Sequence, residues 1–333
     1  MKTLEDYGID EAKFGTNQMK EIKEGLKNNV DVSIYANSTF NSEQMKQIRK
    51  GLENGVDASI YADNIFSCQQ MEQIRLGLED KVDVSVYADP SIFSLQMEQI
   101  RKGLKHNVDI STYVNTLYAE QMEQVRLGLE NNVDVSVYAN PRINPYQMKQ
   151  IRLGLESGVD VSYYTDTIFD DRQMEQIRLG LEQKIDVLLY SNPRINSRQM
   201  EQIRLGLTEG IDVSAYKDYV FAQEQMEQIR SGLKNGVDVS HYSDPRFSSL
   251  QMMQIRLGLE HGIDISFYTN ILFTGRQMEQ IRLGMEDGVD VSIYADPRID
   301  YIQMEEIRVK LKKKDATNSA DGKSTSTTSM SSF

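Results

Sequence analysis

The sequence of 333 residues contains no tryptophan, one cysteine and three histidines. Cys68 has no second cysteine to pair with, and His106, His241 and His261 are too few and too scattered for a usual zinc or catalytic constellation. No apolar run approaches the ~20 residues that a bilayer-spanning helix needs, and residues 1–15 lack the apolar segment of a signal peptide. We therefore expect a cytoplasmic protein that is not an enzyme, binds no metal or cofactor and does not enter a membrane.

What the sequence has instead is an internal repeat, and a repeat decides the fold before any local pattern does. The dipeptide Gln-Met recurs every 26 residues, with a single step of 25 between Met97 and Met122. Its methionines are Met19, Met45, Met71, Met97, Met122, Met148, Met174, Met200, Met226, Met252, Met278 and Met304. Proline occurs in alternate copies, mostly as Asx-Pro-Arg-Ile or Asx-Pro-Arg-Phe, so the array repeats in pairs of copies. One continuous array is predicted, although the length alone would suggest two domains.

Each copy is predicted to begin with a long helix. In the eighth copy, Asn196 occupies the N-cap position and Gln199 follows three residues later, which is the pattern of a capping box. Ile203 and Leu207 continue an apolar stripe at helical spacing, and Gly210 should end the helix in the left-handed conformation. Equivalent caps are Asn41, Ser67, Asn144, Asp170, Ser248, Thr274 and Asp300. Where Gly210 stands, other copies have Asn29, Asn107 or Asn132, which suit that conformation, or Lys81 or Lys184, which suit it less well.

A second, shorter helix is predicted after the stop. The pattern apolar-Asp-apolar-x-x-Tyr, Ile211 to Tyr216 in the eighth copy, recurs in eleven copies with small changes. Asp212 would cap a helix of one or two turns, of α or 3₁₀ type. The long helix also contains a glycine at the same position of the repeat in eleven copies, such as Gly206. A glycine inside a helix lowers its stability by ~0.5–1 kcal/mol relative to alanine. We attribute this glycine to close approach of the backbone or a tyrosine ring of a neighbouring layer.

Neither helix can bury its apolar stripe alone, so the copies must stack on one another. The predicted fold is an all-α α-solenoid, a superhelical tandem array with one long helix and one short α or 3₁₀ helix in each 26-residue repeat. Residues 1–14 are expected to cap the N-terminal end and residues 15–314 to form about twelve copies. The Ser/Thr-rich residues 315–333 have almost no apolar content and are expected to be disordered.

The string QMEQIRLGLExGVDVSxYADP resembles the short helical repeats of uncharacterised bacterial proteins, and the resemblance covers residues 15–311. The architecture is also similar to that of leucine-rich-variant solenoids, which alternate an α-helix with a 3₁₀ helix. Their iron–sulfur cysteine cluster has no counterpart in this sequence. The resemblance implies a bacterial binding scaffold and supplies no activity.

An arginine recurs four residues after the methionine, from Arg49 to Arg308, and such a ladder could contact one nucleic-acid phosphate per layer. The balance of charge opposes this interpretation, because 50 acidic and 37 basic residues give a formal net charge of -13 and acids accompany each arginine. Pairing of the arginines with carboxylates or carbonyls of the next layer is the interpretation that we favour. The recurring tyrosines are likewise interpreted as packing residues and not as a platform for stacking bases.

The face of the long helix opposite its apolar stripe should point outward. It is formed by the residue two before the methionine and those one, five and nine after it. Apolar residues recur there: Leu76, Leu95, Leu127, Tyr146, Leu153, Leu179, Leu205, Leu250, Leu257, Leu283 and Ile302. Contiguous exposed apolar surface usually marks an interaction site, unless a further layer such as the short helices covers it. We therefore expect a scaffold that binds a protein, a peptide or another copy of itself, with a nucleic-acid-binding solenoid as the alternative.

Overall fold

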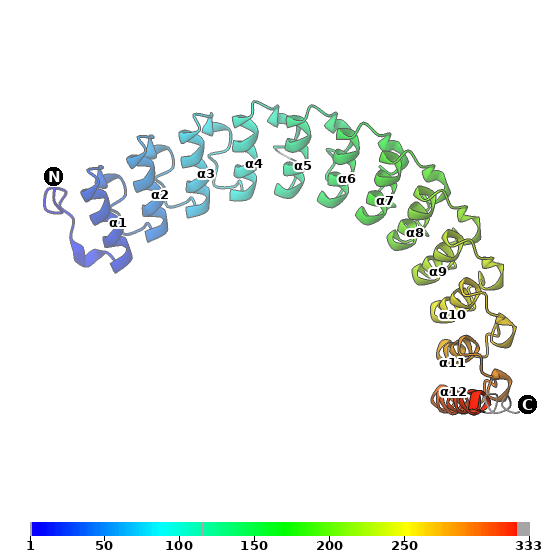
Figure 1. Ribbon diagram of the computed structural model, residues 1–333. Helices are drawn as coiled ribbons and strands as arrows, with labels where there is room; N and C mark the ends of the chain where they lie inside the picture. The colour runs from blue at the N-terminus through cyan, green and yellow to red at the C-terminus, as the bar shows by residue number, and fades with distance from the viewer. Residues whose placement is uncertain (1, 115, 325–333) are drawn as a thin grey trace, which may run out of the picture. The chain divides into compact units, whose positions relative to one another are not determined.

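The computed structural model describes residues 2–114 and 116–324, with side chains up to Lys314. In that part of the chain all regular structure is helical, and an α-helix alternates with a 3₁₀ helix (η) (Figure 1). The α-helices are α1 Thr16–Lys27, α2 Ser42–Glu53, α3 Cys68–Glu79, α4 Ser94–Lys105, α5 Ala119–Glu130, α6 Pro145–Glu156, α7 Asp171–Glu182, α8 Ser197–Thr208, α9 Gln223–Lys234, α10 Ser249–Glu260, α11 Gly275–Glu286 and α12 Tyr301–Ser324. The 3₁₀ helices are η1 Glu11–Lys13, η2 Val32–Ile34, η3 Ala58–Ile60, η4 Val84–Val86, η5 Ile110–Thr112, η6 Val135–Val137, η7 Val161–Tyr163, η8 Val187–Leu189, η9 Val213–Ala215, η10 Val239–His241, η11 Ile265–Phe267 and η12 Val291–Ile293. The predicted α-solenoid architecture is confirmed.

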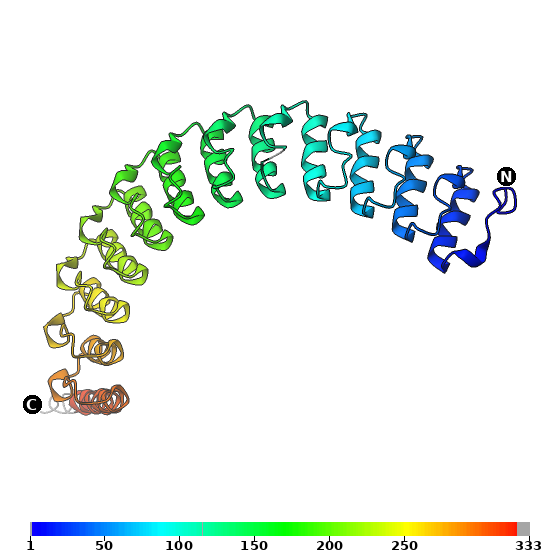
Figure 2. The same cartoon turned by 180° about the vertical axis from the view of Figure 1, so that it is seen from behind.

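The chain divides into two compact units, Met1–Val161 (unit 1) and Ser162–Phe333 (unit 2). Consecutive long helices pack against one another, from α1 to α6 in unit 1 and from α7 to α12 in unit 2. Within each unit the long helices form one row and the 3₁₀ helices form a second row beside it (Figure 2). The same repeat therefore builds both units.

The helix boundaries follow from their end residues, as predicted. In α8, the Asn196 side chain accepts a hydrogen bond from the Gln199 backbone at 3.0 Å, and the Gln199 side chain accepts one from the Asn196 backbone at 2.9 Å. At the other end Gly210 has φ 71°, a left-handed conformation that glycine adopts without steric cost. Lys81 and Lys184 take the same conformation, with φ of 60° and 59°. The fold imposes it on residues that do not favour it.

The helical glycine and the tyrosine fit together within one copy. The eleven tyrosines that end the apolar-Asp-apolar-x-x-Tyr pattern, from Tyr35 to Tyr294, are fully buried. A Cβ added at Gly206 would overlap the hydroxyl of Tyr216, and nine equivalent glycines stand in the same relation to their tyrosines. The predicted close approach of a tyrosine is thus confirmed, but its predicted origin is wrong, because the tyrosine belongs to the same copy and not to a neighbouring layer. The hydroxyl of Tyr216 donates to the Gln202 carbonyl of its own long helix.

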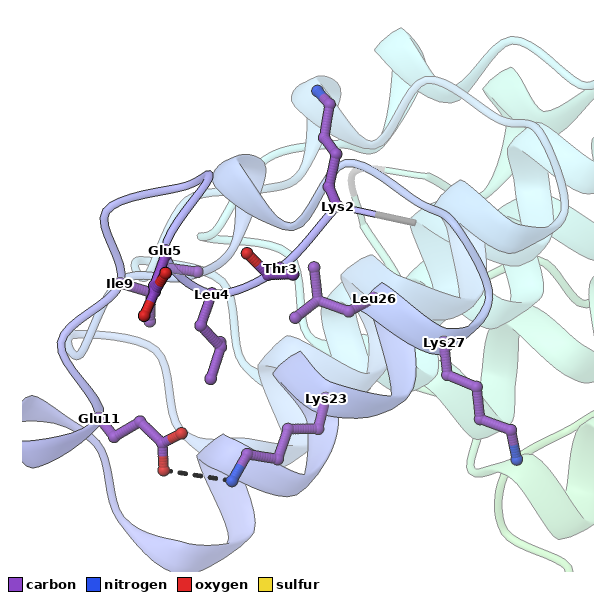
Figure 3. A pocket seen from close by; sticks show the side chains of 9 residues that line it. All are labelled: Lys2, Thr3, Leu4, Glu5, Ile9, Glu11, Lys23, Leu26 and Lys27. Carbon is purple, nitrogen blue, oxygen red and sulfur yellow. Dashed lines mark hydrogen bonds and ion pairs between the residues drawn. The ribbon is translucent and has the colours of Figure 1, made fainter.

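The N-terminal end of the array differs from its middle. The N-terminal segment lies over α1, where Glu11 pairs with Lys23 at 3.1 Å (Figure 3). It leaves a hollow of about 740 Å³ that includes Leu4 and Leu26 in its lining. The segment thus covers the first long helix without repeating the layers that follow it.

The C-terminal end differs as well. There α12 continues through Ser324, whereas the sequence predicted disorder from residue 315. Neither proline nor glycine occurs between Pro297 and Gly322, so the helix meets none of the residues that would end it early. Residues 325–333 of the predicted tail lie outside the described residues.

Candidate functional site

The arginine ladder lies between the layers. Arg152 is 8% exposed; its Nε donates to the Gln124 side chain of the preceding layer at 3.2 Å, and its Nη1 contacts Glu156 of the same helix at 2.6 Å. Where the glutamate is absent, a side chain of the preceding layer replaces it: Asp80 for Arg101, Glu209 for Arg230 and the amide oxygen of Gln183 for Arg204. These guanidinium groups are already bonded within the protein, so the ladder does not form an exposed row for phosphates.

A second ladder, formed by glutamines, was not predicted from the sequence. Besides closing the capping box, the Gln44 side chain donates from Nε2 to the Phe66 carbonyl of the next layer at 2.7 Å. The equivalent glutamines do the same along the array, for example Gln121 to Ile143 and Gln277 to Ile299. A signal existed, because a capping box accepts Glu as readily as Gln, yet every copy has Gln. Only the amide can both accept from its own helix and donate to the next layer.

The leucines predicted to form an interaction surface are only partly accessible. The leucines that stand five positions after the repeat methionine are half-buried: Leu76, Leu127, Leu153, Leu179, Leu205, Leu257 and Leu283. The candidates two residues before the methionine are exposed, by 57% at Leu95, 69% at Tyr146, 40% at Leu250 and 52% at Ile302. The exposed candidates lie at the starts of long helices, and they do not gather in one place: Leu95 and Tyr146 belong to unit 1, and Leu250 and Ile302 to unit 2.

In unit 1 the exposed candidates are joined by two aromatic residues. Phe93 and Tyr118 are 76% and 74% exposed and occupy the N-cap positions of α4 and α5. With Leu95 and Tyr146 they place four large side chains at the N-terminal ends of α4, α5 and α6, three helices that pack in succession. We call these four residues the α4–α6 patch. Phe93 and Tyr118 were not predicted from the sequence, although the absence of a capping residue from these two copies was a signal.

The patch has a local energetic cost. Neither Phe93 nor Tyr118 makes a side-chain capping hydrogen bond, whereas Asn41 and Ser67 accept from the third residue of their helices. Replacing a capping residue by alanine typically costs ~0.5–2 kcal/mol. Two consecutive helices therefore have an aromatic side chain in water at a position where a small polar residue would stabilise them.

The single irregular step of the repeat lies in the same region. Met122 follows Tyr113 by nine positions, whereas Met97 follows Tyr87 by ten. The Tyr113 hydroxyl is the one buried side-chain polar atom without a hydrogen-bond partner in the described part of the chain. In the next copy the Tyr138 hydroxyl donates to the Gln124 carbonyl at 3.0 Å. The shortened connection thus coincides with a missing interior hydrogen bond.

Neither a metal site nor a membrane-spanning helix is found among the described residues. No group of three or more His, Cys, Asp or Glu side chains there is arranged to hold a metal ion. None of the described helices has both the length and the apolar character needed to cross a bilayer. No protein-family model matches the chain, and neither a curated protein sequence nor a solved structure matches it.

Proposed function

We propose that this protein is a non-enzymatic scaffold that binds another protein through the α4–α6 patch. The exposure of Phe93, Leu95, Tyr118 and Tyr146 on three consecutive helices is the observation that carries the proposal. A cytoplasmic location and a kinship with the short helical repeats of bacterial proteins are parts of the same proposal.

The size of the patch suits a binding hot spot. At roughly 150–250 Å² per aromatic side chain, its exposed parts amount to on the order of 400–600 Å². The largest apolar patch of a typical monomer is about 300–600 Å² and is often functional. A standard interface buries about 800 Å² per partner. Further residues of the long-helix row, such as exposed Glu120 and Lys149, would supply a polar rim.

Loss of the helix caps supports a functional origin for the patch. A serine or asparagine in place of Phe93 or Tyr118 would stabilise its helix, as equivalent residues do in α2 and α3. An aromatic residue there lowers stability and exposes apolar surface. Tyrosine and phenylalanine are also among the residues enriched in protein interfaces.

Quantitative pull-down from native cells, combined with sedimentation equilibrium of the isolated protein, tests the proposal. The double variant Phe93→Ser/Tyr118→Ser should lose a partner or self-association that the unchanged protein has, while keeping its circular dichroism spectrum. Leu272→Ser, which removes a 70% exposed leucine from unit 2, is the matched control and should bind normally. Retention of every partner by the double variant would reject the patch.

Filter binding to RNA and DNA at low and moderate salt tests the alternative. Affinity that falls steeply with salt would show phosphate contacts and would replace a protein-binding function by a nucleic-acid-binding one. We expect no such affinity, because the arginines are bonded between layers and the net charge is -13.

A further inference from the structure

A second feature of the surface lies in unit 2, on the row of 3₁₀ helices. A hollow of about 350 Å³ opens between η8 and η9, and its lining includes Leu188, Ile195, Lys217 and Tyr219. We call it the η8–η9 hollow. Ligand pockets span roughly 300–1,000 Å³, so this volume suits one or two side chains of a partner. Because the hollow belongs to another unit and another row, it is independent of the α4–α6 patch.

Leu188 departs from the repeat at this place. Ten other copies have serine at the same position: Ser33, Ser59, Ser85, Ser111, Ser136, Ser162, Ser214, Ser240, Ser266 and Ser292. In several of them the hydroxyl donates to the cap aspartate, as Ser136 does to Asp134 at 2.6 Å. Leu188 lacks that hydrogen bond and leaves 71% of its surface in water. The repeat's own folding requirements do not explain a leucine there.

The charges around the hollow differ from those of the later proline copies, although the copy of Arg142 likewise has Asn140 in place of the aspartate. In two later proline copies the loop arginine pairs with an aspartate of its own turn, Arg246 with Asp244 and Arg298 with Asp296. The equivalent of that aspartate in the copy of Arg194 is Asn192, and the Arg194 guanidinium lies over the Tyr219 ring, 5.8 Å from its centre. Arg194 therefore lacks the turn aspartate of those copies and lies beside the aromatic wall of the hollow.

Lys217 supplies a second cation in the lining. Five other copies have alanine at this position: Ala36, Ala62, Ala88, Ala139 and Ala295. Among the described residues, neither Lys217 nor Arg194 has a carboxylate within 4.0 Å. The nearby acids act as caps, since Asp212 accepts from the Ser214 backbone and Asp218 from the Val220 backbone. Leu188 and Arg194 of one copy and Lys217 and Tyr219 of the next thus bring apolar side chains and two cations to one hollow, whose lining also includes Asp218.

We propose that the η8–η9 hollow binds a peptide segment of a partner protein in which an apolar side chain stands beside a carboxylate. The apolar side chain would lie against Leu188 and Tyr219 above buried Ile195. The carboxylate would lie between Arg194 and Lys217, where charge complementarity favours it. A partner with a basic residue in place of the acid would be repelled.

The probe is an octapeptide of glycine and serine with 4-fluorophenylalanine followed by glutamate at its centre, observed by ¹⁹F NMR. The unchanged protein should broaden the fluorine signal at millimolar peptide. Leu188→Ser and Lys217→Ala should each weaken binding about tenfold, because each removes one of the two contacts that the hollow offers. Replacing the peptide's glutamate by glutamine should have an effect similar to that of Lys217→Ala.

The two variants restore residues that the repeat uses elsewhere, so they should fold, and unchanged thermal unfolding checks this. Leu272→Ser serves as the control, because it removes an exposed leucine of unit 2 outside the hollow lining. The proposal is overturned if the peptide does not bind, if Leu188→Ser and Lys217→Ala bind it like the unchanged protein, or if the glutamine peptide binds as well as the glutamate peptide. None of these outcomes bears on the α4–α6 patch.

Discussion

The interiors of unit 1 and unit 2 are built from the same recurring residues. The two units differ in the positions at which their surfaces depart from the repeat. In unit 1, Phe93 and Tyr118 replace capping residues on the row of long helices. In unit 2, Leu188 and Lys217 replace serine and alanine on the row of 3₁₀ helices. Methionine, glycine and tyrosine recur inside both. Stacking thus fixes the interior of every layer, whereas positions in contact with water are free to acquire a function.

The largest effect should come from breaking the shared interior. Gly180→Leu in unit 2 and Gly128→Leu in unit 1 place a side chain against Tyr190 and Tyr138. Overpacking of this kind costs ~1–3 kcal/mol, and the two variants should lose similar stability in urea unfolding. An unchanged midpoint for either one would show that its glycine does not face the tyrosine.

Two tyrosine variants should differ in stability within unit 1. Tyr138→Phe removes a hydroxyl that donates to a buried carbonyl, which should cost ~1 kcal/mol. Tyr113→Phe removes a hydroxyl without a partner and should be neutral or stabilising. Urea unfolding of the two variants measures the difference. Equal losses would mean that the Tyr113 hydroxyl has a partner in solution.

Restoring a cap should reverse the main surface difference between the units. Phe93→Ser provides a hydroxyl for the start of α4 and is expected to raise stability by ~0.5–1 kcal/mol. The reverse change in unit 2, Asn196→Phe, should lower it by a similar amount, because Asn196 caps α8. Thermal unfolding followed by circular dichroism gives both values. A loss of stability in Phe93→Ser would indicate that the phenylalanine packs against the protein.

The smallest effect concerns a position at which both units carry the same strain. Lys81→Gly in unit 1 and Lys184→Gly in unit 2 remove a side chain from a left-handed backbone. The relief is partly offset by the greater freedom of glycine in the unfolded chain, so the expected gain is about 0.5 kcal/mol in each case. Gly210→Lys is the opposite change and should lose about as much. A destabilised Lys81→Gly variant would show that the lysine side chain contributes contacts of its own.

The sequence was sufficient to predict the helices, their caps and their stops because these depend on local chemistry repeated many times. Asn196, Gly210 and Asp212 act as predicted. The exposure of the outward leucines could not be predicted in the same way. A helical wheel tells which way Leu153 points, but the share of its surface that remains in water depends on the spacing of neighbouring layers.

The candidate sites were harder to predict than the fold for a related reason. Leu95 and Tyr146 lie in the predicted outward row, but Phe93 and Tyr118 were missed because they stand at positions that the repeat assigns to caps. The same holds for Leu188, which stands where the repeat has serine. The repeat pattern does not predict the role of a residue that departs from it. The neighbours of such a residue in adjacent layers become known only from the structure.

The glutamine and arginine ladders have a consequence for how such a protein changes over time. Each layer inside a unit donates forward through a glutamine such as Gln44 and backward through an arginine such as Arg75. Any layer therefore presents to its successor the groups that any other layer would present. Loss or gain of 52 residues, two steps of 26, rejoins matching donors and acceptors and keeps the alternation of proline copies. Recombination between copies can thus change the number of copies without requiring any new interior residue.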